Sequence, residues 1–204
     1  MKTMTIFVGL TGGIATGKST IVKFLKKKGY KIHDSDLIVN KIYSQPNKKL
    51  FVILKKIGLS KSIKNKKIDK SIIRDEIFSN KVKKKKLETF IHKEVRKSRS
   101  LFIKKYKNKK NKIIFFDIPL LFEAKLTQIC HYIILLYAPK KTKIERALKR
   151  KTINKKVITK ILKNQIDDKI KKKKSDYIIN TSKPKNHSFK MILKAISNIL
   201  ETNA

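Results

Sequence analysis

The residues between Gly12 and Ser19 have the types and spacing of a phosphate-binding loop. The string Gly-Gly-Ile-Ala-Thr-Gly-Lys-Ser fits the P-loop pattern G-x-x-x-x-G-K-[ST], with an apolar run before it and an amphipathic segment after it. Glycines let the backbone curl so that successive N–H groups face phosphate oxygens. Lys18 is expected to reach the β- and γ-phosphates, and the Ser19 hydroxyl is expected to bind Mg²⁺. These residues predict binding of a nucleoside triphosphate.

Carboxylates follow two later apolar runs. Asp34 and Asp36 come after residues 30–33, and Asp117 comes after residues 113–116. Ligands of open α/β sheets bind beyond the carboxyl ends of the strands, so a carboxylate there can face the γ-phosphate. We expect Asp34 to accept a proton from an attacking hydroxyl, Asp36 to support it or contact substrate, and Asp117 to hold Mg²⁺ directly or through water. Turn or N-cap roles are the alternative for Asp34 and Asp36.

Apolar runs and amphipathic segments alternate along the chain. This pattern is typical of alternating strands and helices, which would position the groups named above. The expected strands are Thr5–Leu10, Lys31–His33, Ile113–Phe116, Tyr132–Tyr137 and Tyr177–Ile179. The expected helices are Lys18–Lys28, ending at Gly29, then Lys140–Lys151, Lys155–Lys172 and Ser188–Leu200. This alternation predicts an α/β fold of the P-loop NTPase type, with a five-stranded, mainly parallel sheet flanked by helices.

The length of the chain predicts a single domain, 1–204, and the spacing of its strands is uneven. A nucleotide-binding core is expected over about 1–36, 111–139 and 175–204. About 80 residues separate the second strand from the third, with helical periodicity, so 37–110 is expected to be a helical insertion. The long, basic segment 140–174 is a second irregular region.

The formal net charge is +40, from 54 Lys and Arg against 14 Asp and Glu. Such a charge favours nucleic acid or an anionic membrane as a partner. Only five of the basic residues are arginines, whereas nucleic-acid binders use arginine for bidentate contacts with phosphate and guanine. Lys, Ile and Asn are favoured by A/T-rich codons. We therefore interpret the charge as compositional bias on a solvated surface and expect no specific nucleic-acid partner.

Cysteine content and hydropathy indicate a cytoplasmic protein. No segment reaches the roughly 18 continuous apolar residues of a membrane span, so no membrane partner is expected. Cys130 is the only cysteine, which excludes an intramolecular disulfide and a cysteine zinc cluster. It lies beside the apolar run 132–138, so a buried structural thiol is expected.

These residues resemble the dephospho-CoA kinase family over about 4–182. The P-loop lies in a string typical of the family, Val8–Thr20, and Asp-Ile-Pro-Leu-Leu-Phe-Glu at Asp117–Glu123 is among its most specific strings. The other matches are Asp34-Ser35-Asp36, Leu87-Glu88 with His92, the arginine pair Arg146 and Arg150, Gln165, and the last strand with its flanks at 176–180.

The resemblance implies ATP-dependent phosphorylation of the ribose 3′-hydroxyl of dephospho-CoA, the last step of CoA synthesis. It also implies three parts: the P-loop core, a helical CoA-binding lobe at about 37–110 and a mobile lid at about 140–174. ATP and dephospho-CoA are the implied partners and Mg²⁺ the cofactor, and we expect a monomer or weak homo-oligomer. The expected ATP-binding residues are Gly12, Gly13, Ala15, Thr16, Gly17, Lys18, Ser19, Thr20, Arg146 and Arg150. The expected dephospho-CoA-binding residues are Thr11, Asp36, Lys70, His92, Leu120 and Phe122.

Arg146 and Arg150 are two of the five arginines in a chain that uses lysine for nearly every cation. A planar guanidinium suits the charge that spreads over the oxygens of a transferring phosphoryl group. We expect at least one of them to close over ATP and to be catalytic together with Lys18 and Asp34. Surface helix cations are the alternative for the arginines, and core packing is the alternative for Leu120 and Leu121.

Four positions depart from the family pattern. Lys93 follows His92 where the family usually has proline. Ala15 replaces a common glycine, which fits if its φ is negative. Lys70 and Lys171 stand in place of arginines and lose bidentate phosphate geometry while keeping a charge. These changes place the contacts of the two lysines, rather than the activity, in doubt.

Three other functions are compatible with parts of this sequence. A P-loop kinase for a nucleoside monophosphate or a shikimate-like acceptor would share the loop, but the string Asp117–Glu123 argues against it. The charge alone suggests a nucleic-acid-binding ATPase. A decayed paralogue retained for binding is disfavoured by the intact Lys18, Ser19 and Asp34.

Overall fold

The computed structural model describes residues 4–107, 112–149 and 154–203. By its internal contacts the chain forms two compact units. The first is Met1–His33 with Tyr106–Ala204, and the second is Asp34–Lys105. The division into core, insertion and lid stays a prediction. Within the described residues, no helix combines the length and the hydropathy that a membrane crossing needs.

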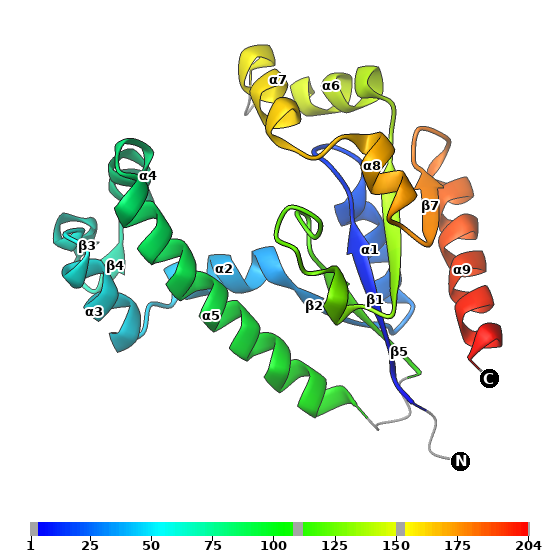
Figure 1. The fold of residues 1–204 in the computed structure, drawn as a ribbon, viewed down its shortest axis with the longest axis horizontal. Helices are drawn as coiled ribbons and strands as arrows, with labels where there is room; N and C mark the ends of the chain where they lie inside the picture. Colours follow the sequence, from blue (N-terminus) through cyan, green and yellow to red (C-terminus); the bar gives the residue numbers. More distant parts are fainter. Residues whose placement is uncertain (1–3, 108–111, 150–153, 204) are drawn as a thin grey trace. The chain divides into compact units, whose positions relative to one another are not determined.

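A five-stranded sheet with the order β2-β5-β1-β6-β7 forms the first unit (Figure 1). The strands are β1 (Ile6–Thr11), β2 (Lys31–Asp34), β5 (Ile113–Asp117), β6 (Tyr132–Tyr137) and β7 (Tyr177–Asn180). Strand β1 pairs in parallel with β5 and β6, and β6 pairs in parallel with β7. The predicted α/β fold and its five strands are confirmed. The sheet brings the P-loop, which follows β1, beside Asp117 at the end of β5.

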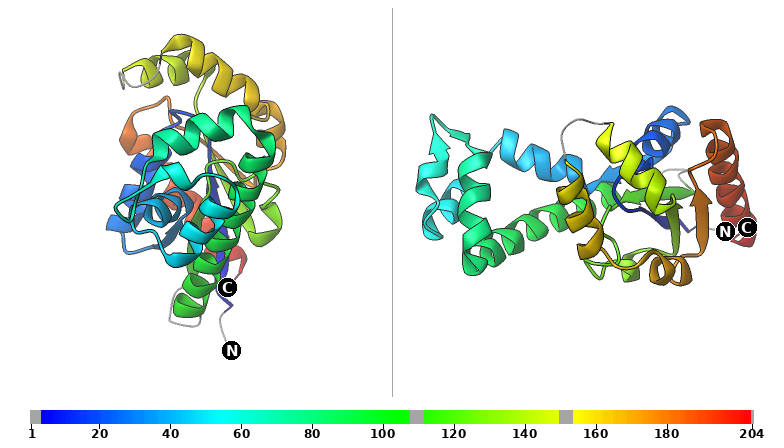
Figure 2. Two further views of the ribbon diagram at one scale, coloured as in Figure 1. Left: turned by 90° about the vertical axis from the view of Figure 1, so that its left-hand side faces the viewer. Right: turned by 90° about the horizontal axis from the view of Figure 1, so that it is seen from above.

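The two faces of the sheet are covered by different segments. Ile6, Val8 and Leu10 of β1 belong to one buried cluster with side chains of α1 (Lys18–Lys27) and α9 (Lys185–Thr202). Segment 118–131 and α8 (Asp168–Lys173) lie against the opposite face (Figure 2). Both faces of β1 are therefore buried, which explains why its sequence is a continuous apolar run.

The basic segment Lys155–Lys172 was expected to be one helix, but it forms two helices, α7 (Lys155–Asn164) and α8 (Asp168–Lys173). The helix before them is α6 (Lys140–Leu148). The prediction is wrong at Gln165, where the backbone is extended and the helix is interrupted. Two side chains stabilise this interruption. Glu123 accepts a hydrogen bond from the backbone N–H of Ile166 at 3.0 Å, and Asp167 caps α8 by accepting from Lys169 N at 2.6 Å.

The second unit is mainly helical, with a short hairpin that the sequence analysis did not predict. Its elements are α2 (Ser35–Ser44), α3 (Lys48–Lys56), η1 (Ser60–Ser62), β3 (Ile63–Lys64), β4 (Lys67–Ile68), α4 (Lys70–Ser79) and α5 (Lys81–Tyr106). Its core joins α3, α4 and α5 through Leu50, Leu54, Ile73, Leu87 and Ile91. The hairpin turn uses Asn65 and Lys66 at φ of +48° and +60°. Asparagine tolerates this left-handed conformation well, whereas lysine is not a typical turn residue, so the sequence did not indicate a turn here.

Candidate active site

The loop between β1 and α1 is shaped by two glycines. Gly17 has a φ of +78° and is the N-cap of α1, and no side-chain hydrogen bond caps this helix start. A Cβ at Gly12 would come within 2.6 Å of Thr16 Oγ1 and 2.7 Å of the Leu136 carbonyl oxygen, so no side chain fits there. Because the first amides of a helix lack intrahelical acceptors, this helix start is suited to binding an anion.

Ala15 lies in the left-handed region, with a φ of +56°, so the expectation of a negative φ is wrong. A non-glycine residue in that region costs about 1–3 kcal/mol. Its methyl group is buried and belongs to a cluster with Ala147 of α6 and Ile158 of α7. Burial of the methyl group against two helices offsets part of the strain and joins the P-loop to α6 and α7.

Lys18 and Asp117 form an ion pair between Lys18 Nζ and Asp117 Oδ1. Both side chains are largely buried, with 13% and 6% of their surface exposed. The structure therefore places two of the predicted groups, Lys18 and Asp117, in direct contact. Ser19, the next residue of α1, is exposed.

Thr11 is buried and donates its hydroxyl to the Pro119 carbonyl at 3.1 Å, which holds the start of the 118–123 segment next to β1.

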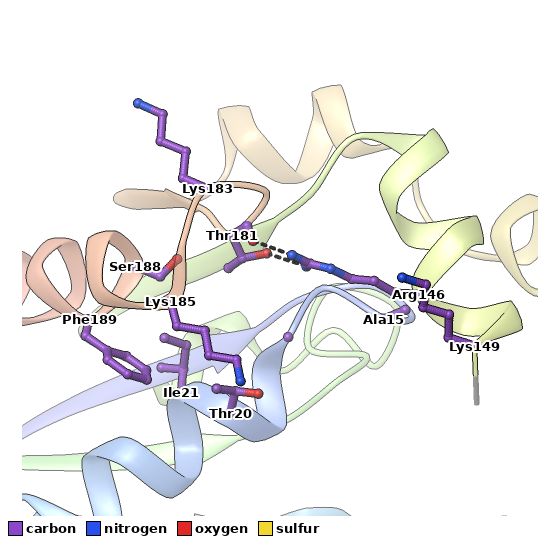
Figure 3. Close-up of a pocket in the computed structure, with 11 residues that line it drawn as sticks. Ala15, Thr20, Ile21, Arg146, Lys149, Thr181, Lys183, Lys185, Ser188 and Phe189 are labelled. Atoms are coloured by element: carbon purple, nitrogen blue, oxygen red, sulfur yellow. Dashed lines mark hydrogen bonds between the residues drawn. The ribbon is translucent and has the colours of Figure 1, made fainter.

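Arg146 of α6 donates two hydrogen bonds to Thr181, the residue after β7. Its Nη2 lies 2.7 Å from the Thr181 carbonyl oxygen, and its Nη1 lies 3.3 Å from Thr181 Oγ1. Both residues line a pocket of about 300 Å³ that also takes in Gly17 and Thr20 (Figure 3). Arg146 is thus next to the P-loop, whereas Arg150 lies outside the described residues. Thr181 was not predicted from the sequence, because a threonine after a strand matches no motif.

Asp34 is the last residue of β2 and the N-cap of α2. Its Oδ1 accepts a hydrogen bond from Leu37 N at 2.9 Å, and the side chain is half-buried. The alternative raised for Asp34, a capping role, is therefore correct, and its role as a base stays a prediction. Asp36 is exposed in the first turn of the same helix.

The break between α7 and α8 brings Gln165 against the P-loop. Gln165 Oε1 lies 2.9 Å from the position that a Cβ at Gly13 would take. Lys171, which was compared with a ligand-binding arginine, is instead buried in α8 and pairs with Glu123 Oε1 at 2.7 Å. The same Glu123 oxygen accepts the hydrogen bond from Ile166 N. Glu123 thus ties the loop after β5 to both sides of the break.

Known proteins resemble this chain over nearly its whole length. A family model described as dephospho-CoA kinase matches residues 6–186. A dephospho-CoA kinase of Fusobacterium nucleatum is 35% identical over 198 residues, covering 97% of this chain and 98% of that protein. The chain belongs to the dephospho-CoA kinase family. Membership makes it a phosphotransferase of the final step of CoA biosynthesis.

Solved structures agree with this assignment. The structure of a dephospho-CoA kinase from Campylobacter jejuni has a TM-score of 0.73 at 31% identity, covering 97% of this chain and 98% of that one. A Thermus thermophilus protein has a TM-score of 0.83 at 23% identity over 97% and 98% of the two chains, which supports the fold alone.

The dephospho-CoA-binding residues that the family resemblance implies are spread over both units. In the second unit, Lys70 opens α4, donates to Asn40 Oδ1 at 3.3 Å and lies over the Tyr43 ring at 5.4 Å. Burial, with a smaller contribution from Glu88, raises the pKa of Tyr43. His92 is exposed on α5.

In the first unit, besides Thr11, the loop after β5 carries two expected substrate residues, Leu120 and Phe122. Phe122 is buried, whereas Leu120 is 46% exposed, so core packing does not account for Leu120. Leu121 is fully buried, so core packing does account for that leucine. Cys130 was expected to be buried and is only half-buried, although its sulfur would lie 2.7 Å from a Cβ at Gly9, so this cysteine packs against β1. The substrate roles of Leu120 and Phe122 stay predictions.

Replacing Glu123 with glutamine is expected to lower the free energy of unfolding by about 3 kcal/mol, because it leaves a buried ammonium without its counter-charge. The Lys171 side chain is only 2% exposed, so water cannot replace the lost carboxylate. Denaturation in urea measures the change. Glu76→Gln is the matched control and is expected to have a smaller effect, because its ion pair with Lys83 is more accessible to water, with 42% of the Glu76 side chain and 26% of the Lys83 side chain exposed. Equal effects of the two substitutions would contradict the structural role of Glu123.

Proposed function

We propose that the chain transfers the γ-phosphoryl group of ATP to the ribose 3′-hydroxyl of dephospho-CoA, giving CoA and ADP. The observation that carries this proposal is the pairing of the P-loop lysine, Lys18, with Asp117, in a chain of the dephospho-CoA kinase family. Asp117 opens the string Asp117–Glu123, so one of the strings most specific to the family begins beside the P-loop lysine.

ATP is proposed to bind along the P-loop and the pocket beside it. The backbone of residues 12–17 and the start of α1 would surround the phosphates. The pocket next to Gly17 and Thr20 continues from the loop and has an apolar wall that includes Ile21 and Phe189. Such a wall suits a nucleobase and its ribose, and Arg146 at its edge would meet the phosphates.

Mg²⁺ is proposed to bind between Ser19, Asp117 and the phosphates of ATP. A hydroxyl and a carboxylate are oxygen donors of the kind Mg²⁺ prefers, and this ion usually takes one or two protein ligands and completes its shell with phosphate and water. The described residues contain no group of three or more His, Cys, Asp or Glu that could hold a metal ion alone. The donor set therefore fits an ion that arrives with ATP, where it would neutralise phosphate charge.

The reaction is proposed to be an in-line transfer in which the protein mainly positions and neutralises charge. The bond from the γ-phosphorus to the β–γ bridging oxygen breaks, and a bond to the 3′-oxygen forms. Asp34 orients the hydroxyl and takes its proton. Lys18 leaves Asp117 for the phosphate oxygens, and Arg146 donates to them. We place this reaction in the cytoplasm, without a membrane or nucleic-acid partner.

The proposed acceptor is tested by ADP release from ATP and Mg²⁺ in the presence of dephospho-CoA, shikimate, nucleoside monophosphates, DNA or RNA. Only dephospho-CoA is expected to sustain ADP release. Faster release with shikimate or a nucleoside monophosphate would favour another P-loop kinase. Stimulation by DNA or RNA that persists at physiological salt would favour the nucleic-acid-binding ATPase suggested by the charge.

A further inference from the structure

We infer that Thr181 is a positioning residue for phosphoryl transfer, because it holds the guanidinium of Arg146 against the P-loop. The inference rests on the proposed function, in which Arg146 donates to the phosphates of ATP. Thr181 follows β7 directly and is only 7% exposed. It contacts three separate elements through one hydroxyl and one backbone unit.

The hydroxyl of Thr181 links the P-loop to the arginine. Its Oγ1 lies 2.7 Å from the Thr16 carbonyl oxygen in the P-loop and 3.1 Å from the Tyr137 carbonyl oxygen at the end of β6. A hydroxyl has one proton to donate, and the Thr16 carbonyl oxygen is the nearer of the two acceptors, while Tyr137 O already accepts the backbone N–H of Thr181 at 2.8 Å. Both observations favour donation to Thr16 O, and a lone pair of Oγ1 then accepts from Arg146 Nη1.

Arg146 is held at two points by this one residue. The carbonyl and the hydroxyl oxygen of Thr181 each accept from a different terminal nitrogen of the guanidinium. A guanidinium has five N–H donors, so three remain for a ligand after these two hydrogen bonds. Figure 3 shows the arginine side chain reaching from α6 to Thr181 at the edge of the pocket.

Arg146 and Thr181 lie next to the start of α1, where the phosphates of ATP are proposed to bind. A Cβ at Gly17 would lie 3.8 Å from Thr181 Oγ1 and 3.9 Å from Arg146 Nη1. Gly17 is the N-cap of α1, so the held guanidinium lies at the helix start that is suited to phosphate. Fixing a flexible arginine there before ATP binds reduces the conformational entropy lost on binding and orients the remaining donors.

The test removes the hydroxyl of Thr181 without changing the shape of the side chain. In Thr181→Val, kcat/KM for ATP is expected to fall about 10-fold or more, since a shift of about 1 Å in a catalytic group can cost about 100-fold. Thr181→Ser keeps the hydroxyl and is expected to stay within about threefold of the unchanged enzyme. Thr202→Val, which removes a hydroxyl bonded to Asn198 O on α9, is the matched control and is expected to leave kinetics unchanged.

A double-mutant cycle separates positioning from a merely structural role. In an Arg146→Ala background, Thr181→Val is expected to add less than about a twofold loss, because the group it positions is gone. The inference would be overturned if the loss of kcat/KM in the double variant equalled the product of the losses in the two single variants. Unchanged kinetics in Thr181→Val would also overturn it. If the valine variant does not fold, Thr181→Ala is read by the same criteria. If dephospho-CoA is not phosphorylated by the unchanged enzyme, the proposed function fails first, and the cycle is then measured on ATP affinity.

Discussion

Substitution of Lys18 with alanine is expected to lower kcat by about 10²–10³-fold, the cost typical of removing one donor that stabilises transition-state charge. In this structure Lys18 pairs with Asp117, and both side chains are largely buried. When ATP binds, the ammonium group is available to the β- and γ-phosphates next to it. The measurement is kcat at saturating ATP, Mg²⁺ and dephospho-CoA, with circular dichroism to establish that the variant is folded.

The chain offers a matched control on the same helix. Lys23 is an exposed residue of α1, so Lys23→Ala removes the same charge one and a half turns further from the loop. Its kcat is expected to stay close to that of the unchanged enzyme. A loss in Lys23→Ala as large as that in Lys18→Ala would mean that the general positive field, and not the position of one ammonium group, supports turnover.

Substitution of Asp34 with asparagine is expected to lower kcat by about 10²–10⁴-fold, the range that general base catalysis contributes. The substitution separates chemistry from structure, because Asp34 also caps α2 through Oδ1. Asparagine is as good an N-cap as aspartate, so the cap survives while the base is lost. Steady-state kinetics and thermal unfolding of the same preparation distinguish the two effects.

The capping aspartate of another helix in the second unit serves as the control. Asp69 caps α4 by accepting hydrogen bonds from Ser71 N and Ile72 N, and hydrogen bonding from the Ser71 hydroxyl is the main cause of its lowered pKa. Asp69→Asn makes the same chemical change at the same kind of position. Its kcat is expected to be nearly unchanged. Near-normal turnover in Asp34→Asn would remove Asp34 from the role of base.

The parts of the fold that depend on continuous apolar runs were predictable from the sequence. The run Tyr132–Tyr137 is a strand with the predicted ends, and Ile113–Phe116 continues by one residue to Asp117. The P-loop was also predictable, because its pattern of glycines, Lys18 and Ser19 is long and has the required flanks. These signals lie in adjacent residues, so they need no knowledge of tertiary contacts.

The missed features depend on contacts between distant residues. The break at Gln165 arises because Glu123 accepts from Ile166 N, a hydrogen bond across 43 positions of the chain. The helical periodicity of the segment gave no sign of it. The role of Thr181 likewise comes from the Thr16 carbonyl, 165 positions away. Ala15 takes a positive φ although alanine gives no local signal for one, and packing of its methyl group against distant helices offsets part of the strain.

The lysine-rich composition hides a small number of lysines with specific partners. Lys18 pairs with Asp117, Lys171 with Glu123, and Lys143 of α6 with Asp168 at the start of α8. All three lysines are largely buried, whereas Lys23 is exposed. Lysines that are buried and paired with a carboxylate therefore stabilise the structure of the first unit, whereas an exposed lysine such as Lys23 only adds to the net charge.

The most direct test of the central claim is identification of the product. The enzyme is incubated with dephospho-CoA, ATP and Mg²⁺, and the product is analysed by mass spectrometry and phosphorus NMR. The account predicts the mass of CoA, with one new phosphomonoester on the 3′-oxygen of the ribose and one ADP for each CoA formed. Unchanged dephospho-CoA, or a phosphate on any other oxygen, would contradict it.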